Sequence, residues 1–321
     1  MSTTPETNVA IACQGGGSHT AFTAGVLQKL LPNMPDDHTL VALSGTSGGA
    51  LCATTAWYGL LVGDETEAVE RLDALWHDLS ARTVVEQSLN DTGVLLTSME
   101  SQGVPLPKMS PYLNPLSELG HTEVRRVLER QVDFDELPEL AGDDDPNLFV
   151  SSVNVADGKF TIHDGTDLTA DEVLASTAVP TLFEAVTLAD DPHWDGLFSQ
   201  NPPIRNFLSD IPEAERKPDE IWIVQINPMT RATEPKSTEA IDDRRNELAG
   251  NLSLMQEVEF IEQVNEWVAD ESLTPDRYKH VDVRWIQLDM DLSYSSKLNR
   301  DPSFVEHLME LGRTKAASFL S

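Results

Sequence analysis

Two short apolar runs are each followed by a cluster of small residues and then by an apolar, helix-favouring segment. This repeated order constrains the fold more than any other feature. The first run is NVAIACQ (8–14), followed by GGG (15–17), and the second is TLVALS (39–44), followed by GTSGG (45–49). Two strand–loop–helix units within about 60 residues are typical of a parallel sheet covered by helices. We therefore predict a three-layer α/β/α fold with a central, mostly parallel sheet.

The rest of the chain continues this alternation. Apolar runs and hairpin signals predict strands at 148–155, 159–163, 185–189, 221–227 and 283–289. Helical spacing and capping residues predict helices at 64–79, 169–176, 237–270 and 302–320. The apolar spacing of 237–270, which includes Leu248, Leu252, Ile261, Val264 and Trp267, favours a helix that packs on the core over one that faces a membrane.

The segment 83–120 is rich in proline, and we predict that it is irregular. A segment that runs over the protein surface is favoured over a cap that covers an active site.

The pentapeptide GTSGG matches the pattern G-x-S-x-G, which places a serine on a sharp turn between a strand and a helix. Ser47 is the candidate nucleophile. The small residues Gly45, Gly48 and Gly49 allow strand and helix to come close, and the helix N-terminus favours negative charge near the serine oxygen. The predicted strand before the turn and helix after it favour a nucleophile elbow over an ordinary Gly-Ser turn.

The stretch QGGGSH (14–19) places three successive glycines at the start of a helix, where exposed N–H groups can bind an anion. It is not a phosphate-binding P-loop, because no Gly-Lys-Ser/Thr follows, and Thr20 stands where a dinucleotide-binding fingerprint requires glycine. Two interpretations remain: an oxyanion hole formed by Gly15, Gly16 and Gly17, or a plain tight turn. The neighbouring serine unit favours the oxyanion hole.

The residue that accepts the serine proton is harder to identify. Among the eight histidines, neither His280 nor His307 lies in an obvious catalytic loop, as a Ser-His-Asp enzyme would require. In PHWDGLFSQNPPI (192–204), Asp195 precedes Gly196 in a turn of small residues, and its carboxylate could take the proton directly. On this stretch alone, an ordinary turn aspartate is favoured.

Taken together, these stretches resemble the patatin-like phospholipase family. The likeness covers about residues 8–228 and rests on ACQGGGSHTAFTAGVLQKLL, LSGTSGGALCA, LFVSSVNVADGKFTIHDG, EVLASTAVPTLFEAV and HWDGLFSQNPPI, which follow one another in the order of the family. It implies a patatin-like catalytic domain over 8–228. The resemblance does not extend to 229–321, for which we expect a mainly helical region packed on the same domain.

The resemblance also implies a catalytic dyad in which Ser47 is the nucleophile and Asp195, before Gly196, is the base. The amides of residues 15–17 would form the oxyanion hole. This chain departs from the family pattern at His19 and Thr20, where the family usually has Arg or Lys followed by Gly. It departs again at Leu197, where the family has Gly or Ala.

The composition adds a strong charge signal. The chain has 54 acidic and 22 basic residues, a formal net charge of −32, and the acids are spread along its length. No basic patch stands out, which argues against nucleic acid as a partner. Self-repulsion of this size destabilises a compact chain unless salt screens it, so we expect a halophilic protein of a high-salt cytoplasm.

Two further features support an intracellular location. The first ten residues lack the basic and apolar regions of a secretory signal, and the apolar segment 50–62 is too short to span a bilayer. Cys13 and Cys52 lie in apolar patterns, where buried free thiols are favoured over a redox role.

The expected function is that of a lipid acyl hydrolase, which cleaves carboxylic esters through an acyl-enzyme without metal or cofactor. An intracellular polyhydroxyalkanoate depolymerase is the closest alternative. A non-catalytic anion-binding module and a Ser-His-Asp hydrolase are alternatives of other classes. The expected partners are an ester or lipid substrate and, transiently, a lipid or polyester surface. Because a histidine at position 19 is neutral near pH 7, neutral esters are favoured over phospholipids.

Overall fold

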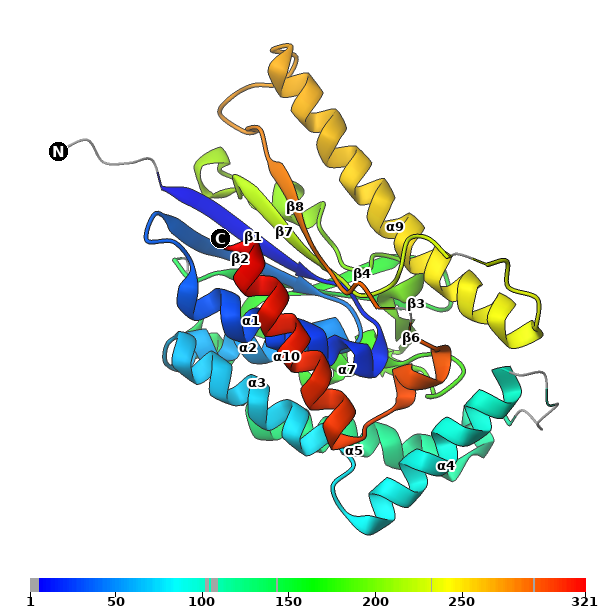
Figure 1. Cartoon of the computed structure of the whole chain (residues 1–321). Coiled ribbons are helices and arrows are strands. Elements are labelled where there is room, and N and C mark those ends of the chain that lie inside the picture. The colour runs from blue at the N-terminus through cyan, green and yellow to red at the C-terminus, as the bar shows by residue number, and fades with distance from the viewer. Residues whose placement is uncertain (1–5, 102–103, 105–108, 143, 232, 291) are drawn as a thin grey trace.

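The computed structural model describes residues 6–101, 104, 109–142, 144–231, 233–290 and 292–321. Their centre is an eight-stranded sheet in the order β5-β6-β3-β2-β1-β7-β8, with β4 paired to β3 (Figure 1). The strands are β1 (Thr7–Cys13), β2 (His38–Gly45), β3 (Asn147–Asn154), β4 (Phe160–Asp164), β5 (Val186–Leu188), β6 (Asp191–Asp195), β7 (Glu220–Gln225) and β8 (Asp282–Gln287). The run from β3 to β8 is parallel, whereas β4, β5 and β6 are joined by antiparallel pairings.

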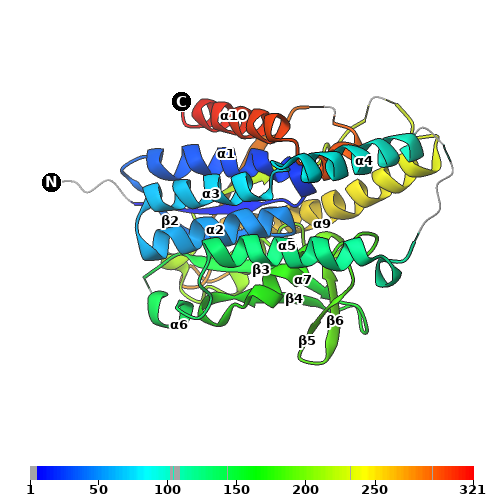
Figure 2. The ribbon, with the colours of Figure 1, turned by 90° about the horizontal axis from the view of Figure 1, so that it is seen from below.

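Helices cover both faces of this sheet. One face carries α1 (Ala21–Leu30), α2 (Gly48–Val62), α3 (Glu65–Leu79) and α10 (Pro302–Phe319), which Figure 2 shows in a row. The long helix α9 (Thr238–Ala269) lies on the opposite face with the short α8 (Asn206–Ser209). The other helices are α4 (Val84–Ser101), α5 (Pro115–Gln131), α6 (Leu137–Leu140) and α7 (Ala170–Thr177).

The central strand β1 shows why the sheet needs both helical layers. Its side chains alternate between two buried clusters: Val9 and Ile11 face the α1 side, whereas Ala10 and Ala12 face the α9 side. Successive side chains of a strand point to opposite faces, so a strand that is apolar throughout must be covered twice. The predicted three-layer α/β/α fold with a mostly parallel sheet is confirmed.

All of the predicted strands and helices are present, and the structure contains further elements that were not predicted, such as α6 and α8. Strand β6 (Asp191–Asp195) was not predicted, because it is short and carries charged residues at both ends. The prediction that 83–120 is irregular is wrong for α4 and for the start of α5. Helix α4 begins with reciprocal hydrogen bonds between Thr83 and Glu86, a capping box that the sequence contains.

Residues 229–321 are built into the same sheet and layers. Strand β8 pairs in parallel with β7, and α10 lies against α1. The two helices approach closely because a side chain at Gly25 would meet the Met309 carbonyl, and one at Gly312 would meet the Phe22 carbonyl. Within the described residues, no helix combines the length and the low charge that crossing a bilayer requires.

Helix α9 packs on the sheet as predicted, but the predicted apolar stripe is only partly right. Ile261 and Val264 are buried in the core below it. Leu248, Leu252 and Trp267 are instead exposed. Leu248 and Leu252 alternate along the helix with the buried Glu247, Asn251 and Leu254, so they lie on its solvent-facing side rather than beyond the core.

Candidate active site

The serine predicted as nucleophile lies at the junction between β2 and α2. Ser47 is the residue before the first turn of α2, and its backbone has a φ of 57°. This left-handed conformation is unfavourable for a residue with a side chain and costs of order 1–3 kcal/mol. The Ser47 N–H donates to the buried Ser176 Oγ of α7 at 2.9 Å, which helps to hold the turn. Such a turn is the geometry expected of a nucleophile elbow.

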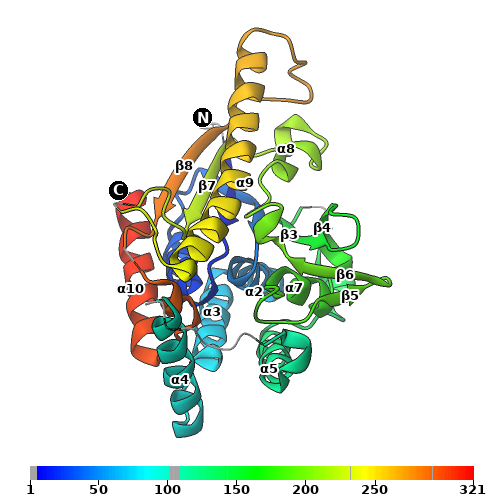
Figure 3. The same ribbon diagram turned by 90° about the vertical axis from the view of Figure 1, so that its right-hand side faces the viewer.

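The glycine-rich loop after β1 packs directly on this elbow. A Cβ atom at Gly15 would lie 2.8 Å from Ser47 Cβ, and one at Gly48 would lie 2.1 Å from Thr20 Oγ1. No side chain fits at either position, so both glycines are required for the two loops to touch. Both loops lie where the parallel strands end, on the side that faces the viewer in Figure 3.

The hydrogen bonds of this loop determine which amides can bind an anion. The Gly15 N–H donates to Asn201 Oδ1 at 2.7 Å, so this amide is already occupied. The carbonyls of Gly15, Gly16 and Gly17 accept from Asn227 Nδ2, the His19 N–H and Thr20 Oγ1, respectively. For the Gly16 and Gly17 N–H groups, no acceptor is found among the described residues. The predicted three-amide oxyanion hole is therefore reduced to two candidate donors, Gly16 and Gly17.

Asp195 is the last residue of β6, which pairs with β3 and thereby approaches β2 and its elbow. The side chain is 1% exposed, and its Oδ1 accepts from the Leu197 N–H at 2.8 Å. Its Oδ2 has no partner with normal hydrogen-bond geometry among the described residues. Burial raises the pKa of Asp195 to about 7, and the Ser47 hydroxyl and the Leu197 N–H offset part of that rise. The structure thus brings Ser47 and Asp195 together.

Gly196 completes the turn after Asp195. A Cβ atom here would lie 2.3 Å from Ser151 Oγ on β3. The same Ser151 hydroxyl lies 2.6 Å from Thr46 Oγ1, and both hydroxyls lie 2.7 Å from the Gln200 carbonyl. The turn that carries Asp195 and the elbow that carries Ser47 are therefore joined by buried hydrogen bonds.

The histidines lie elsewhere. His163 and His193 both contact Ser152 Oγ, and His19 Nε2 lies 2.8 Å from Ser296 Oγ. No histidine in the described ranges forms a hydrogen bond with Ser47 or Asp195. The geometry gives the serine a carboxylate neighbour and no imidazole.

Helix α9 supports the site from residues that sequence reasoning missed. Asn251 Oδ1 accepts from Gln14 Nε2 at 2.9 Å, next to the glycine-rich loop. Glu257 accepts from Gln200 Nε2 and from the N–H groups of Ile204 and Arg205, in the segment after Asp195. No local pattern singles out these α9 residues, because their role depends on a contact between segments more than 50 residues apart.

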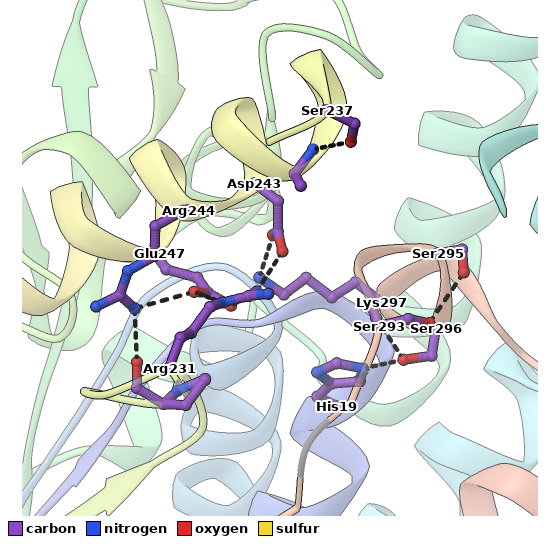
Figure 4. A network of polar contacts seen from close by, with 12 residues as sticks. His19, Arg231, Ser237, Asp243, Arg244, Glu247, Ser293, Ser295, Ser296 and Lys297 are labelled. Atoms are coloured by element: carbon purple, nitrogen blue, oxygen red, sulfur yellow. Dashed lines mark hydrogen bonds and ion pairs between the residues drawn. The ribbon is translucent and has the colours of Figure 1, made fainter. Parts of the chain in front are cut away.

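A charged network extends this support to the C-terminal region (Figure 4). Arg231 and Arg244 pair with the buried Glu247, and Arg231 also pairs with Asp243. Lys297, in the short helix η7 (Tyr294–Leu298), lies 3.4 Å from Asp243. A Cβ atom at Gly17 would lie only 2.5 Å from the Lys297 carbonyl oxygen, so the loop and η7 are in close contact. The network therefore fixes α9 and η7 beside the glycine-rich loop.

His19 and Lys297 set the charge next to this loop. Burial and the neighbouring Lys297 lower the pKa of His19 to about 3, so the ring is neutral near pH 7. Both cysteines are buried free thiols, as predicted, and burial raises the pKa of Cys52 to about 12. In the parts of the chain that the structure describes, no three His, Cys, Asp or Glu side chains gather as metal ligands would.

Two solved structures share limited similarity with this chain. The structure is similar to VipD from Legionella pneumophila, with 14% identity and a TM-score of 0.45, over 99% of this chain and 67% of VipD. It is also similar to ExoU from the type III secretion system of Pseudomonas aeruginosa, solved with SpcU, with 16% identity and a TM-score of 0.29. That likeness covers 84% of this chain and 53% of the other. No curated protein sequence matches the chain.

A family model described as patatin-like phospholipase matches residues 11–208. The match includes the glycine-rich loop, the Ser47 elbow and the Asp195 turn, and it extends over 198 of the 321 residues. The chain belongs to the patatin-like phospholipase family.

Proposed function

We propose that this member of a lipid-hydrolase family cleaves carboxylic esters through a Ser47–Asp195 dyad and an acyl-enzyme. One observation carries the proposal. A buried carboxyl group with a pKa of about 7 and an unpartnered Oδ2 lies beside the hydroxyl of a serine on a strained elbow. A base with a pKa near the working pH is suited to take and return a proton.

In the proposed reaction, Ser47 Oγ attacks the ester carbonyl carbon while its proton passes to Asp195 Oδ2. The carbonyl oxygen becomes an oxyanion, which the Gly16 and Gly17 N–H groups and the N-terminus of α2 stabilise. When the tetrahedral intermediate collapses, the alcohol leaves with the proton from Asp195. Water then attacks the acyl-enzyme and gives a proton to Asp195, and Ser47 recovers its proton as the carboxylic acid departs.

The substrate that we propose is a neutral ester, such as an acylglycerol or a short-chain ester, rather than a diacyl phospholipid. His19 is buried and uncharged near pH 7, and the nearby Lys297 is paired with Asp243. The His19 ring therefore supplies no positive charge that would favour a phosphate group. Initial rates on p-nitrophenyl butyrate, a triacylglycerol emulsion, amorphous polyhydroxybutyrate and phosphatidylcholine vesicles test this order. Phosphatidylcholine as the best substrate would contradict it.

The dyad is tested by replacing each member. Ser47→Ala is expected to abolish hydrolysis and labelling by a fluorophosphonate, and Asp195→Asn to abolish turnover because an amide cannot accept the proton. His193→Ala, a nearby buried histidine without contact to Ser47, is the control and is expected to keep most activity. Loss of activity only in histidine variants would replace the dyad with a triad. Absence of labelling in the folded wild type would favour a non-catalytic binder.

A further inference from the structure

Large apolar side chains are exposed on several elements near the proposed site. Helix α4, the short helix η3 (Pro111–Leu113), the start of α5 and the short helix η5 (Gly196–Phe198) all carry them. We call the following six residues the apolar rim: Leu95, Leu96, Leu113, Leu116, Leu119 and Phe198, each 45–76% exposed. Exposed leucines that occur singly are ordinary, whereas a group on one side of a protein marks an interaction site.

The rim lies on the side of the molecule that holds the proposed site. Phe198 follows Asp195 by three residues in the same turn. Figure 3 views this side, with α4, α5 and the first half of α9 around the ends of the parallel strands. Helix α4 contacts α9 and η7, and α9 contacts η5. Ser253 Oγ of α9 donates to the Ser199 carbonyl next to Phe198, which places the exposed Leu252 beside the rim.

The leucines of the rim face outward because the opposite sides of their helices are anchored. In α5, Ser117 Oγ donates to the Leu182 carbonyl at 2.8 Å, and Gly120 lies against the Phe183 ring. Leu116 and Leu119, three residues apart, share a different side of that helix. In α4, Asn90 accepts from the Arg300 N–H at 2.7 Å. The helices are thus fixed to the protein by polar contacts while their leucines remain in solvent.

Charge indicates what the rim can contact. The 26 residues from 92 to 117 contain one acidic and one basic residue, whereas the whole chain has 54 acidic residues in 321. A chain of net charge −32 repels both an anionic membrane and a second copy of itself. The described leucines of this nearly uncharged segment are the part of the surface that is best suited to a neutral lipid–water interface.

We propose that the apolar rim docks the protein on an electrically neutral lipid–water interface, so that the Ser47 site faces the esters there. This inference rests on the proposed function, since the interface is the place where the substrate gathers. Docking is nevertheless a binding step, which can be measured without hydrolysis. Leucine side chains that leave water for an acyl layer gain the ordinary free energy of apolar burial.

The test measures flotation with phosphatidylcholine vesicles in about 2 M potassium chloride, where the Debye length is below ~3 Å. All proteins carry Ser47→Ala, so that no ester is consumed, and the protein with this substitution alone is the parent. The double variants Leu116→Gln/Leu119→Gln and Leu95→Gln/Leu96→Gln are each expected to weaken vesicle binding about tenfold or more. The matched control is Trp267→Gln, which removes a larger exposed apolar side chain from the last turn of α9, and it is expected to bind like the parent.

Several outcomes would overturn the proposal. These are that the parent fails to float, that both rim variants bind as well as the parent at an unchanged melting temperature, or that Trp267→Gln weakens binding as much as they do. A parent that is dimeric by sedimentation and does not float, with monomeric rim variants, would assign the rim to contact between copies. Failure of the proposed function is visible separately: wild type would then float but hydrolyse no ester.

Discussion

At the scale of single residues, the properties of Asp195 follow from its burial. A carboxyl group that loses water favours its neutral form, and this effect outweighs the influence of the nearby Ser47 hydroxyl and of the hydrogen bond from the Leu197 N–H. The result is a base with a pKa of about 7 rather than one near 4. A carboxylate with an ordinary pKa would be ionised at neutral pH but would hold a proton poorly during the reaction.

This pKa predicts the pH dependence of the reaction. Asp195 must be ionised to accept the Ser47 proton, so kcat/KM is expected to rise tenfold per pH unit below about 7 and to level off above it. Initial rates on p-nitrophenyl butyrate between about pH 5 and 9 measure the profile, with the melting temperature recorded at each pH as a control. A profile that is flat down to about pH 5 would contradict the raised pKa of Asp195, since a base with the ordinary pKa of an aspartate is already ionised there.

The same pKa predicts an effect on stability. The folded-state pKa of Asp195 is raised, so the folded protein binds this proton more tightly than the unfolded chain. Stability from this group is therefore present below pH 4 and is lost as pH rises through about 7. Asp195→Asn removes the buried charge, and its melting temperature at pH 8 is expected to be higher than that of wild type. At pH 5 the two proteins are expected to be closer. The prediction is contradicted if the melting temperature of Asp195→Asn, measured relative to wild type, is lower at pH 8 than at pH 5.

The candidate residues differ in how far the sequence reveals them. Ser47 and its glycines were predictable, because a strand, a small-residue turn and a helix are local patterns. Asp195 required the resemblance, since its own stretch favoured an ordinary turn. Asn201, whose side chain accepts a hydrogen bond from the Gly15 N–H, was not predicted at all. Its role arises from a contact across 186 residues, which no spacing rule encodes.

At the scale of elements, α9 supports the site from outside the matched family region. Two asparagines of this helix allow a matched comparison. Asn251 bonds to Gln14, beside the glycine-rich loop, and Asn265 bonds to the backbone of Val281, before β8. Both side chains bridge α9 to another segment, but only Asn251 does so next to the proposed oxyanion donors.

We therefore predict that Asn251→Ala and Asn265→Ala lower the free energy of unfolding by similar amounts, about 1–2 kcal/mol each. Only Asn251→Ala is expected to lower kcat/KM, by about tenfold, because Gln14 Nε2 would lose its acceptor and only Gln14 Oε1 would still hold this side chain beside the loop. Denaturant unfolding and initial rates measure the two effects. Equal activity in the two variants would show that α9 has no influence on the loop.

The elements also show where local patterns fail. The strands that are buried on both faces and the capped helices α3 and α7 were predictable, since their signals come from their own residues. Helix α4 was missed because the prolines beyond it and its exposed apolar residues obscured the amphipathic pattern. A helix whose apolar side chains face solvent lacks the one-sided pattern that identifies helices packed on a core.

At the scale of the whole molecule, the three-layer fold was predictable from the order of strands and helices. The properties of the surface depend instead on its excess of acidic residues. Even if every basic residue pairs with one acid, 32 acidic residues remain without a cation. The compact fold holds these charges closer together than the unfolded chain does, so their repulsion favours unfolding.

We therefore predict that stability depends steeply on salt. The Debye length falls from about 10 Å at 0.1 M salt to about 3 Å at 1 M, so added salt screens the repulsion between surface charges. The melting temperature and the rate on p-nitrophenyl butyrate are expected to rise together between about 0.1 and 2 M potassium chloride. A neutral osmolyte at matched osmolarity is the control and is expected to give a smaller rise, since it does not screen charge. If the melting temperature stays constant across this range, or if the osmolyte stabilises as well as the salt, the acidic surface is not an adaptation to high salt.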